Sequence, residues 1–161
     1  MRLLRSIHDL GTSLEHYIAQ LFMYEFRGHA MWGLSLEGVQ NGDVDVVAWL
    51  PPTLVYIECK SGLPADIAAA ELSQTLRRTL DLAPDLSIVL VDTESDLSPV
   101  CSKLASVPSG PSAPLVGQRD FGGVHFGHYE HWPIYVAGAK PSLLSQLRWC
   151  LRHFHSHAKR S

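Results

Sequence analysis

The chain has 161 residues, of which 46% are hydrophobic and 18% are charged, a balance typical of one globular domain with a sizeable core. The net charge of −3 does not favour nucleic-acid binding, so any basic surface must be local. No apolar run approaches the roughly 18 residues of a membrane helix, and the charged start of the chain does not fit a signal peptide. Three distant cysteines without a C-x-x-C motif indicate reduced thiols, which predicts a cytoplasmic protein.

The first predicted element is a helix from Thr12 to Arg27, followed by a strand from His29 to Leu36. The apolar positions of the helix recur at helical spacing: Leu14, Ile18, Leu21, Phe22 and Phe26. Thr12 and Glu15 fit a capping box, with Thr12 as the N-cap and Glu15 at the third helical position. Capping alone would explain Glu15. Two glycines and an asparagine between Glu37 and Gly42 then predict a turn.

Two apolar strands joined by a Pro-Pro turn are predicted next, from Val44 to Leu50 and from Leu54 to Cys59. If Trp49 faces Leu54 across an antiparallel pair, then Asp45 lies directly opposite Glu58. Opposed residues have Cβ atoms roughly 4.5–5.5 Å apart. That spacing would let two carboxylates share one divalent cation, whereas a register shifted by one residue would put them on opposite faces.

The two carboxylates allow two interpretations. Because strand residues alternate between faces, Glu58 and Lys60 point the same way, and they can form a solvated ion pair on an exposed face. Alternatively, Asp45 and Glu58 form a site for Mg²⁺ or Mn²⁺, hard cations that take oxygen ligands. The strongly apolar strands favour the second interpretation, since buried like charges are costly unless they are paired or metal-bound.

Asp45, followed after thirteen residues by the E-x-K motif of Glu58, Cys59 and Lys60, resembles the PD-(D/E)xK nuclease superfamily. Here Val44 replaces the proline of the family name. The resemblance covers roughly Thr12 to Asp92. It implies a restriction-endonuclease-like fold and metal-dependent hydrolysis of phosphodiester bonds, with Asp45 and Glu58 binding the cation and Lys60 assisting the attacking water.

The resemblance also implies two accessory residues. Many family members carry a glutamate on the first helix that joins the metal site, and Glu15 matches it, with Glu25 as a weaker candidate. Pro64 suits the start of a helix that runs to Leu82. A glutamine on this helix commonly completes the family's site, and Gln74 is the matching position. The family's frequent aromatic residue four positions later is Arg78 here, a departure from the pattern.

In the second half of the chain, the sequence pattern predicts a further strand, helix and loop. The apolar run from Asp85 to Val91 predicts a central parallel strand, reached by a βαβ crossover. A short helix is expected from Ser98 to Val107 and a mobile loop from Pro108 to Gly117. Three histidines follow at three-residue spacing, but a strand would place the middle one on the other face, which argues against a shared zinc ion. They are His125, His128 and His131.

A last helix is predicted to open at Pro141, and its end is rich in basic residues. These cations complement the helix dipole, or they form a phosphate-binding arm. The residues expected to contact nucleic acid are Arg77, Arg78, Arg148, Arg152, Lys159 and Arg160.

Taken together, the sequence predicts a single PD-(D/E)xK nuclease-like domain over residues 1–161. Its fold would be α/β, with a mixed central sheet flanked by helices. The expected partner is nucleic acid, with DNA placed ahead of RNA, and the chain would act as a homodimer or be recruited by another protein. Two alternatives stay open: a catalytically silent member of the fold that only binds nucleic acid or a partner, and a different phosphohydrolase that acts on nucleotides.

Overall fold

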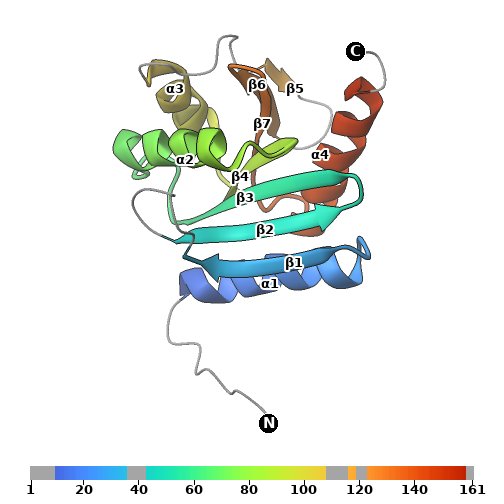
Figure 1. The fold of residues 1–161 in the computed structure, drawn as a ribbon. Coiled ribbons are helices and arrows are strands. Elements are labelled where there is room, and N and C mark those ends of the chain that lie inside the picture. Colours follow the sequence, from blue (N-terminus) through green and yellow to red (C-terminus); the bar gives the residue numbers. More distant parts are fainter. Residues whose placement is uncertain (1–9, 36–42, 108–115, 119–122, 159–161) are drawn as a thin grey trace.

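The protein is described here by a computed structural model that covers residues 10–35, 43–107, 116–118 and 123–158 (Figure 1). It is an α/β structure with a mixed seven-stranded sheet in the order β1-β2-β3-β4-β7-β6-β5. The elements are α1 Leu10–Tyr24, β1 His29–Leu34, β2 Val44–Leu50, β3 Thr53–Ser61, α2 Ala69–Leu82, β4 Leu86–Asp92, α3 Ser98–Ser106, β5 Val116–Gln118, β6 Val124–Tyr129, β7 Trp132–Ala137 and α4 Leu143–Ala158.

The centre of the sheet is parallel and its two sides are antiparallel. β3 pairs with β4 and β4 with β7 in parallel, whereas β1, β2 and β3 form an antiparallel meander. The predicted crossover from β3 through α2 to β4 is confirmed. The predicted apolar strand is also confirmed as central, because β4 is buried along nearly its whole length.

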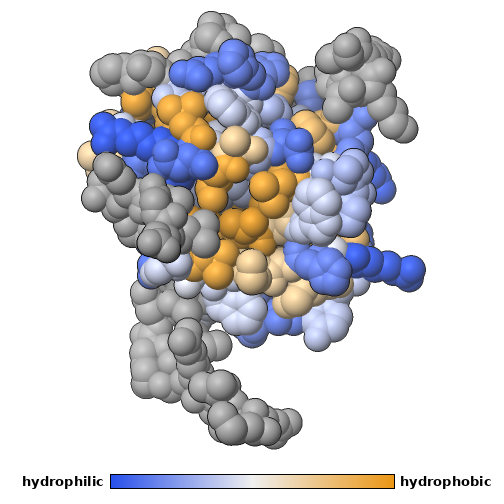
Figure 2. All heavy atoms as spheres, in the orientation of Figure 1, coloured by the Kyte–Doolittle hydropathy of each residue, from blue (hydrophilic) through white to orange (hydrophobic). Residues whose placement is uncertain are grey.

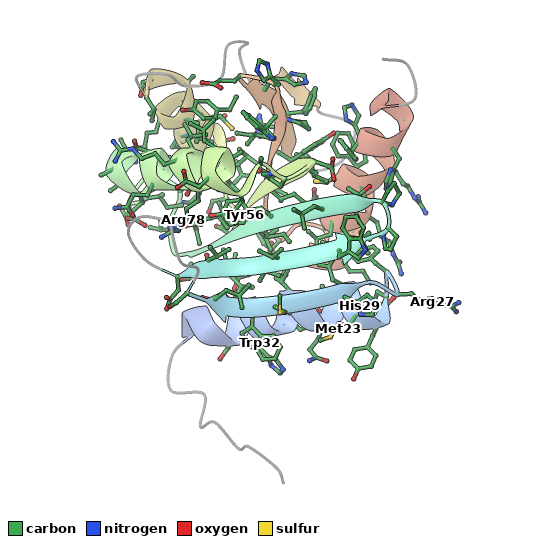
Figure 3. All side chains as sticks on the ribbon, viewed as in Figure 1. Met23, Arg27, His29, Trp32, Tyr56 and Arg78 are labelled. Carbon is green, nitrogen blue, oxygen red and sulfur yellow. The ribbon has the colours of Figure 1, made fainter. Side chains whose placement is uncertain are left out.

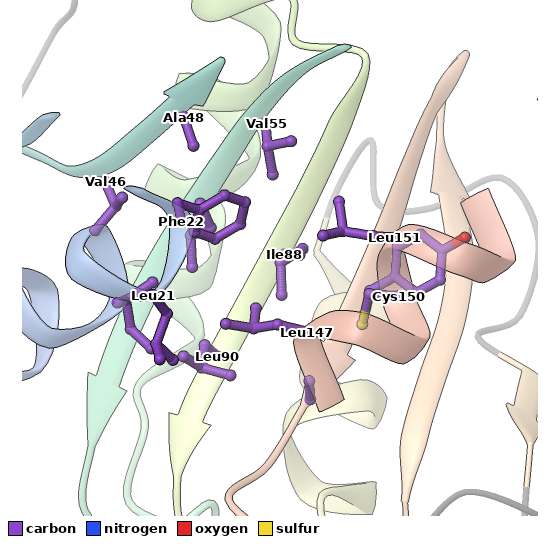
Figure 4. Close-up of a cluster of buried hydrophobic side chains, with 14 of the residues drawn as sticks. Leu21, Phe22, Val46, Ala48, Val55, Ile88, Leu90, Leu147, Cys150 and Leu151 are labelled. Carbon is purple, nitrogen blue, oxygen red and sulfur yellow. The ribbon is translucent and has the colours of Figure 1, made fainter. Parts of the chain in front are cut away.

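Helices cover both faces of the sheet. α1 and α4 pack on one face, where Phe22 and Leu147 meet residues of β2, β3 and β4 (Figure 4). α2 and α3 cover the other face over β4 and β7, with Leu72 and Leu104 among the buried residues. No helix in the described part of the chain combines the length and apolar composition needed to span a membrane.

Three predicted helix starts are wrong. Thr12 lies inside α1, which begins at Leu10, so it is not the N-cap. α2 begins at Ala69 instead of Pro64, and the Glu71 carboxylate accepts the Ala68 N–H at 3.3 Å. At α4, the Ser142 hydroxyl accepts the Ser145 N–H at 3.2 Å, so Pro141 precedes the cap.

Other predicted boundaries differ by a few residues. The first helix ends at Tyr24, and the first strand ends at Leu34. The predicted turn at residues 37–42 lies outside the described residues, as does most of the predicted loop at 108–117, whose last two positions belong to β5. The three histidines fall on a β6–β7 hairpin, with His125 and His128 on β6 and His131 in its turn.

The two ends of α2 provide a test of this backbone geometry. Ala83 follows the helix with a left-handed φ of 44°, so Ala83→Gly should stabilise the protein by about 0.5–1 kcal/mol. Ala70, exposed inside the same helix, should lose about 0.5–1 kcal/mol when changed to glycine. Urea unfolding of the two variants should therefore shift in opposite directions, and equal shifts would contradict the left-handed cap.

Candidate active site

The β2–β3 register places Asp45 and Glu58 opposite each other. The observed pairs include Trp49 with Leu54 and Val46 with Ile57. Continuing the same register by one residue brings Asp45 to Glu58, as the sequence predicts. Val46 and Ile57 belong to the core beneath α1 and α4. Glu58 and Lys60 lie on the other face, where Arg78 and Glu71 of α2 contact them. Asp45 lies at the end of the ladder beside them, close enough for the Glu58 charge to raise its pKa.

Asp45 sits where regular strand pairing is interrupted on both sides. Between β1 and β2, Gly33 would be the partner of Asp45, but these two residues are not paired. Between β2 and β3, the last pair is Val46 with Ile57, next to Asp45. Gly33 has a φ of +59°, a backbone conformation that residues with a side chain rarely adopt. In place of a ladder bond, the Cys59 N–H donates to Asp45 Oδ2 at 2.7 Å.

Glu15 approaches this interruption from α1. Its Oε2 lies 3.7 Å from where a Cβ of Gly33 would stand, and its charge is close enough to raise the pKa of Asp45. The structure therefore brings Glu15 into the neighbourhood that the sequence predicted. Glu25 lies beyond the other end of α1, where Arg148 Nη2 donates to its Oε2 at 2.9 Å, so it is not part of this group.

Glu58 is the buried centre of a cluster of charged and polar groups. It is 1% exposed, and its two oxygens accept from Arg78 Nη1 at 3.0 and 2.9 Å. Lys60 Nζ lies 2.9 Å from Oε1, and the Tyr56 hydroxyl donates to Oε2. Figure 3 shows Tyr56 and Arg78 between β3 and α2. Two cations and one hydroxyl thus satisfy the Glu58 carboxylate without any bound ligand.

The partners of Glu58 stay protonated. Burial, followed by the Glu58 carboxylate, raises the pKa of Tyr56 well above its usual range, so its hydroxyl remains a donor. Burial works to lower the pKa of Lys60, but Glu58 and Glu71 outweigh it and the pKa rises. Lys60 Nζ contacts Glu71 Oε2 at 3.2 Å, which ties β3 to the first turn of α2. Lys60 is therefore a fixed positive charge.

Asp45 carries the negative charge that the cluster leaves uncompensated. Burial and then the Glu58 carboxylate raise its pKa from 3.8 to about 7, with Glu15 adding to the rise. The Cys59 N–H and Lys60 oppose that rise only in part. The Cys59 thiol lies in the same negative environment, and its pKa is raised well above the usual value, chiefly by burial. This thiol is consequently neutral at physiological pH.

The structure separates the remaining predicted site residues. Gln74 and Arg77 are exposed on α2, so Gln74 is not drawn into the cluster as Arg78 is. Arg78, one of the residues expected to contact nucleic acid, is 7% exposed and bound to Glu58. Arg148 and Arg152 lie exposed on α4. Lys159 and Arg160 lie outside the described residues.

The outer part of the sheet, around Trp49 of β2 and Met31 of β1, is only partly covered on the α2 side. β2 alternates between buried residues and more exposed ones, and Trp49 is 40% exposed. Met31 on β1, whose register partner is Val47, is 58% exposed. Figure 2 shows apolar side chains gathered over this part of the sheet, which α2 leaves uncovered in Figure 1.

The donor groups fit a hard cation in part. Asp45 and Glu15 supply carboxylates whose mutual repulsion a cation would relieve. Glu58, however, is held by Arg78, so its ligation would require Arg78 to move away from at least one oxygen. Within the described ranges, no three His, Cys, Asp or Glu side chains are grouped as a ready-made metal site.

Sequence reasoning missed three partners of the cluster: Tyr56, Glu71 and Arg78. A signal was present for each of them. Tyr56 shares strand parity with Glu58 and Lys60, and Glu71 and Arg78 lie seven residues apart, about two helical turns, on one face of α2. The sequence did not show how α2 is rotated over β3, and this rotation directs the face with Glu71 and Arg78 towards Glu58.

Comparison of the chain with protein-family models, with curated proteins and with solved structures found no match.

The raised pKa of Asp45 predicts how stability depends on pH. Between its ordinary value of 3.8 and about 7, the folded state binds the proton more tightly than the unfolded state. Stability from this group is therefore present at low pH and is lost as pH rises towards 7. Asp45→Asn removes the titration, so the variant should gain on the order of 2–4 kcal/mol over the wild type at pH 8.

The advantage should largely vanish at pH 4, where both side chains are neutral in the folded state. Urea unfolding of the metal-free proteins at several pH values measures it. If the Asp45→Asn variant is less stable than the wild type at pH 8, the carboxylate itself is needed to hold the Cys59 N–H.

Proposed function

We propose that this protein is a metal-dependent nuclease of the PD-(D/E)xK type that hydrolyses phosphodiester bonds of nucleic acid. The observation that carries the proposal is the proximity of Asp45, Glu58 and Lys60 at the point where the β2–β3 ladder ends. The mixed sheet flanked by helices is compatible with a restriction-endonuclease-like fold, which the proposal includes.

Each residue has a role in this proposal. Asp45 and Glu58 would hold Mg²⁺ or Mn²⁺, with Glu15 as an accessory ligand. The cation, when bound, supplies a Lewis acid and a more acidic water. Lys60 stays protonated beside Glu58. It therefore orients the attacking water and stabilises the negative charge that develops on the phosphate, and it does not act as a base.

Arg78 gives specific support to a second candidate, a catalytically silent module of the same fold. Arg78 and Lys60 both bind the Glu58 carboxylate, so its negative charge is compensated within the protein. A silent module would keep this cluster as a structural tie between β3 and α2. The nuclease requires Arg78 to yield one oxygen of Glu58 when the metal binds, so the response to metal separates the two candidates.

Cleavage and metal binding test the nuclease proposal. Labelled DNA and RNA, single-stranded and duplex, are incubated with the protein and Mg²⁺, Mn²⁺ or EDTA, and cleavage of DNA is expected with the metals only. Lys60→Ala should lower the cleavage rate by roughly 10²–10³-fold, because it removes a transition-state contact, with little change in nucleic-acid affinity. Lys140→Ala is the control, since Lys140 is exposed and pairs only loosely with Glu94 at 3.8 Å.

Asp45→Asn should abolish both cleavage and the rise in melting temperature that the metal produces. If Lys60→Ala keeps full activity on every substrate that the wild type cuts, the proposed mechanism is wrong. If the wild type cuts none of the substrates and gains no stability from either metal, the silent module is the better description.

A pair of arginine substitutions on α2 tests the tie itself. Arg78→Met leaves the buried Glu58 with Lys60 as its one remaining cation, so the metal-free protein should lose on the order of 3 kcal/mol. Arg77→Met, the matched control at the exposed neighbouring position, should change stability by less than about 0.5 kcal/mol. In a nuclease, Arg78→Met should enlarge the metal-induced rise in melting temperature. A loss of stability with no response to metal would support the silent module.

A further inference from the structure

A basic groove lies at the opposite end of β2 from Asp45. It has a volume of about 420 Å³, within the range of small-ligand sites. Five residues separate Asp45 from Leu50, or roughly 17 Å at the rise of a strand. Leu50 packs against the α1–α4 core, on the face opposite to Glu58 and Lys60, which contact α2. The groove is therefore separate from the candidate active site in both position and face.

The groove combines cations with an apolar floor. Phe26, Leu50 and Leu151 belong to or pack against the core, and Pro51 completes the floor. Around them stand Arg148, Arg152 and His155, which share a face of α4 at helical spacing, and Arg27 from the α1–β1 connection. A basic end of α4 would by itself complement the helix dipole, but that explanation does not account for Arg27.

Arg27 is held at the rim of the groove by an unusual backbone. Its φ is +56°, in the left-handed region that favours glycine. The Gly28 N–H donates to the Phe22 carbonyl at 3.0 Å, which fixes the turn. Gly28 is itself pressed against β2: a Cβ there would stand 2.8 Å from the Trp49 carbonyl oxygen. The arginine, labelled in Figure 3, thus occupies a position where glycine would be easier to accommodate.

The charges define the ligand. Glu25 is the carboxylate that reaches this cluster, at 2.9 Å from Arg148 Nη2. Three arginines less one glutamate give a net charge of +2 before His155 is counted, which matches a phosphate monoester dianion. Guanidinium groups bind phosphate oxygens with paired hydrogen bonds. The apolar floor beside them suits a ring carried next to the phosphate.

From these observations we propose that the groove formed by Arg27, Arg148, Arg152 and His155 binds the phosphate monoester of a nucleotide. The nucleotide is either free or at the end of a strand. Glu25 competes with the phosphate for Arg148. The site does not depend on the proposed nuclease activity, because none of its residues belongs to the Asp45–Glu58 group.

Calorimetric titration of the full chain at low ionic strength tests the site, with adenosine monophosphate, inorganic phosphate and adenosine as probes. Adenosine monophosphate should bind more tightly than either of its parts. Arg27→Gly and Arg152→Gln should each weaken binding by about tenfold or more, since each loses a charge-assisted hydrogen bond. Glu25→Gln should tighten binding, because it releases Arg148. Lys140→Gln, on a remote exposed lysine, should leave the affinity unchanged.

The Arg27→Gly variant separates a loss of affinity from a folding defect. Glycine accepts the positive φ, so this variant should keep or raise the melting temperature while losing affinity. Equal affinities across the wild type and the two arginine variants, or weaker binding by Glu25→Gln, would overturn the proposal. So would equal binding of adenosine and adenosine monophosphate.

A second titration distinguishes the two sources of the phosphate. Oligonucleotides with and without a 5′-phosphate are compared with adenosine monophosphate. Tight binding that depends on the 5′-phosphate assigns the groove to strand ends, and binding of the mononucleotide alone assigns it to free nucleotides. Oligonucleotides that bind equally with and without the terminal phosphate, and are equally weakened by Arg152→Gln, would overturn the assignment to a monoester.

Discussion

The buried carboxylate of Glu58 is the constraint on which the candidate site depends. Glu58 is 1% exposed, so its charge must be compensated. Its carboxylate binds Arg78, Lys60 and Tyr56. Those contacts fix the rotation of α2 over the sheet and keep Lys60 charged. They also leave Asp45 as the group whose negative charge is least compensated. The chemistry available at this edge of the sheet therefore follows from how Glu58 is satisfied.

The two faces of β2 explain why a site can form here at all. Val46 and Ala48 are buried beneath α1, whereas the odd-numbered residues of β2 are only partly covered. β3, one strand further in, is buried on both faces over most of its length. Asp45 and Glu58 therefore face each other across a boundary between an open and a covered sheet. A carboxylate pair at such a boundary can be desolvated enough to interact strongly and still be reached from solvent.

Much of this arrangement was predictable from the sequence. The strand period and the two-proline turn predicted the register of Asp45 and Glu58, because a turn of known length allows few pairings. The partners supplied by α2 were predictable only in part: the spacing of Glu71 and Arg78 puts both on one face of the helix, but nothing in the sequence shows that this face, and not the one that carries Arg77, turns towards β3. That distinction depends on the position of a helix over a sheet, which tertiary packing decides. The helix starts failed for a related reason, because several nearby residues could serve as caps.

The polar cluster and the hydrophobic core differ in how far along the chain they reach. Glu58 and Arg78 are 20 residues apart, and the whole cluster lies within one strand and the helix that follows it. By contrast, the core joins α1 to α4, and Glu25 meets Arg148 across 123 residues. Closing a short loop costs less chain entropy than closing a long one. The charged centre of this protein is thus assembled from local contacts, while the core cluster beneath α1 and α4 requires the first and last described helices to meet.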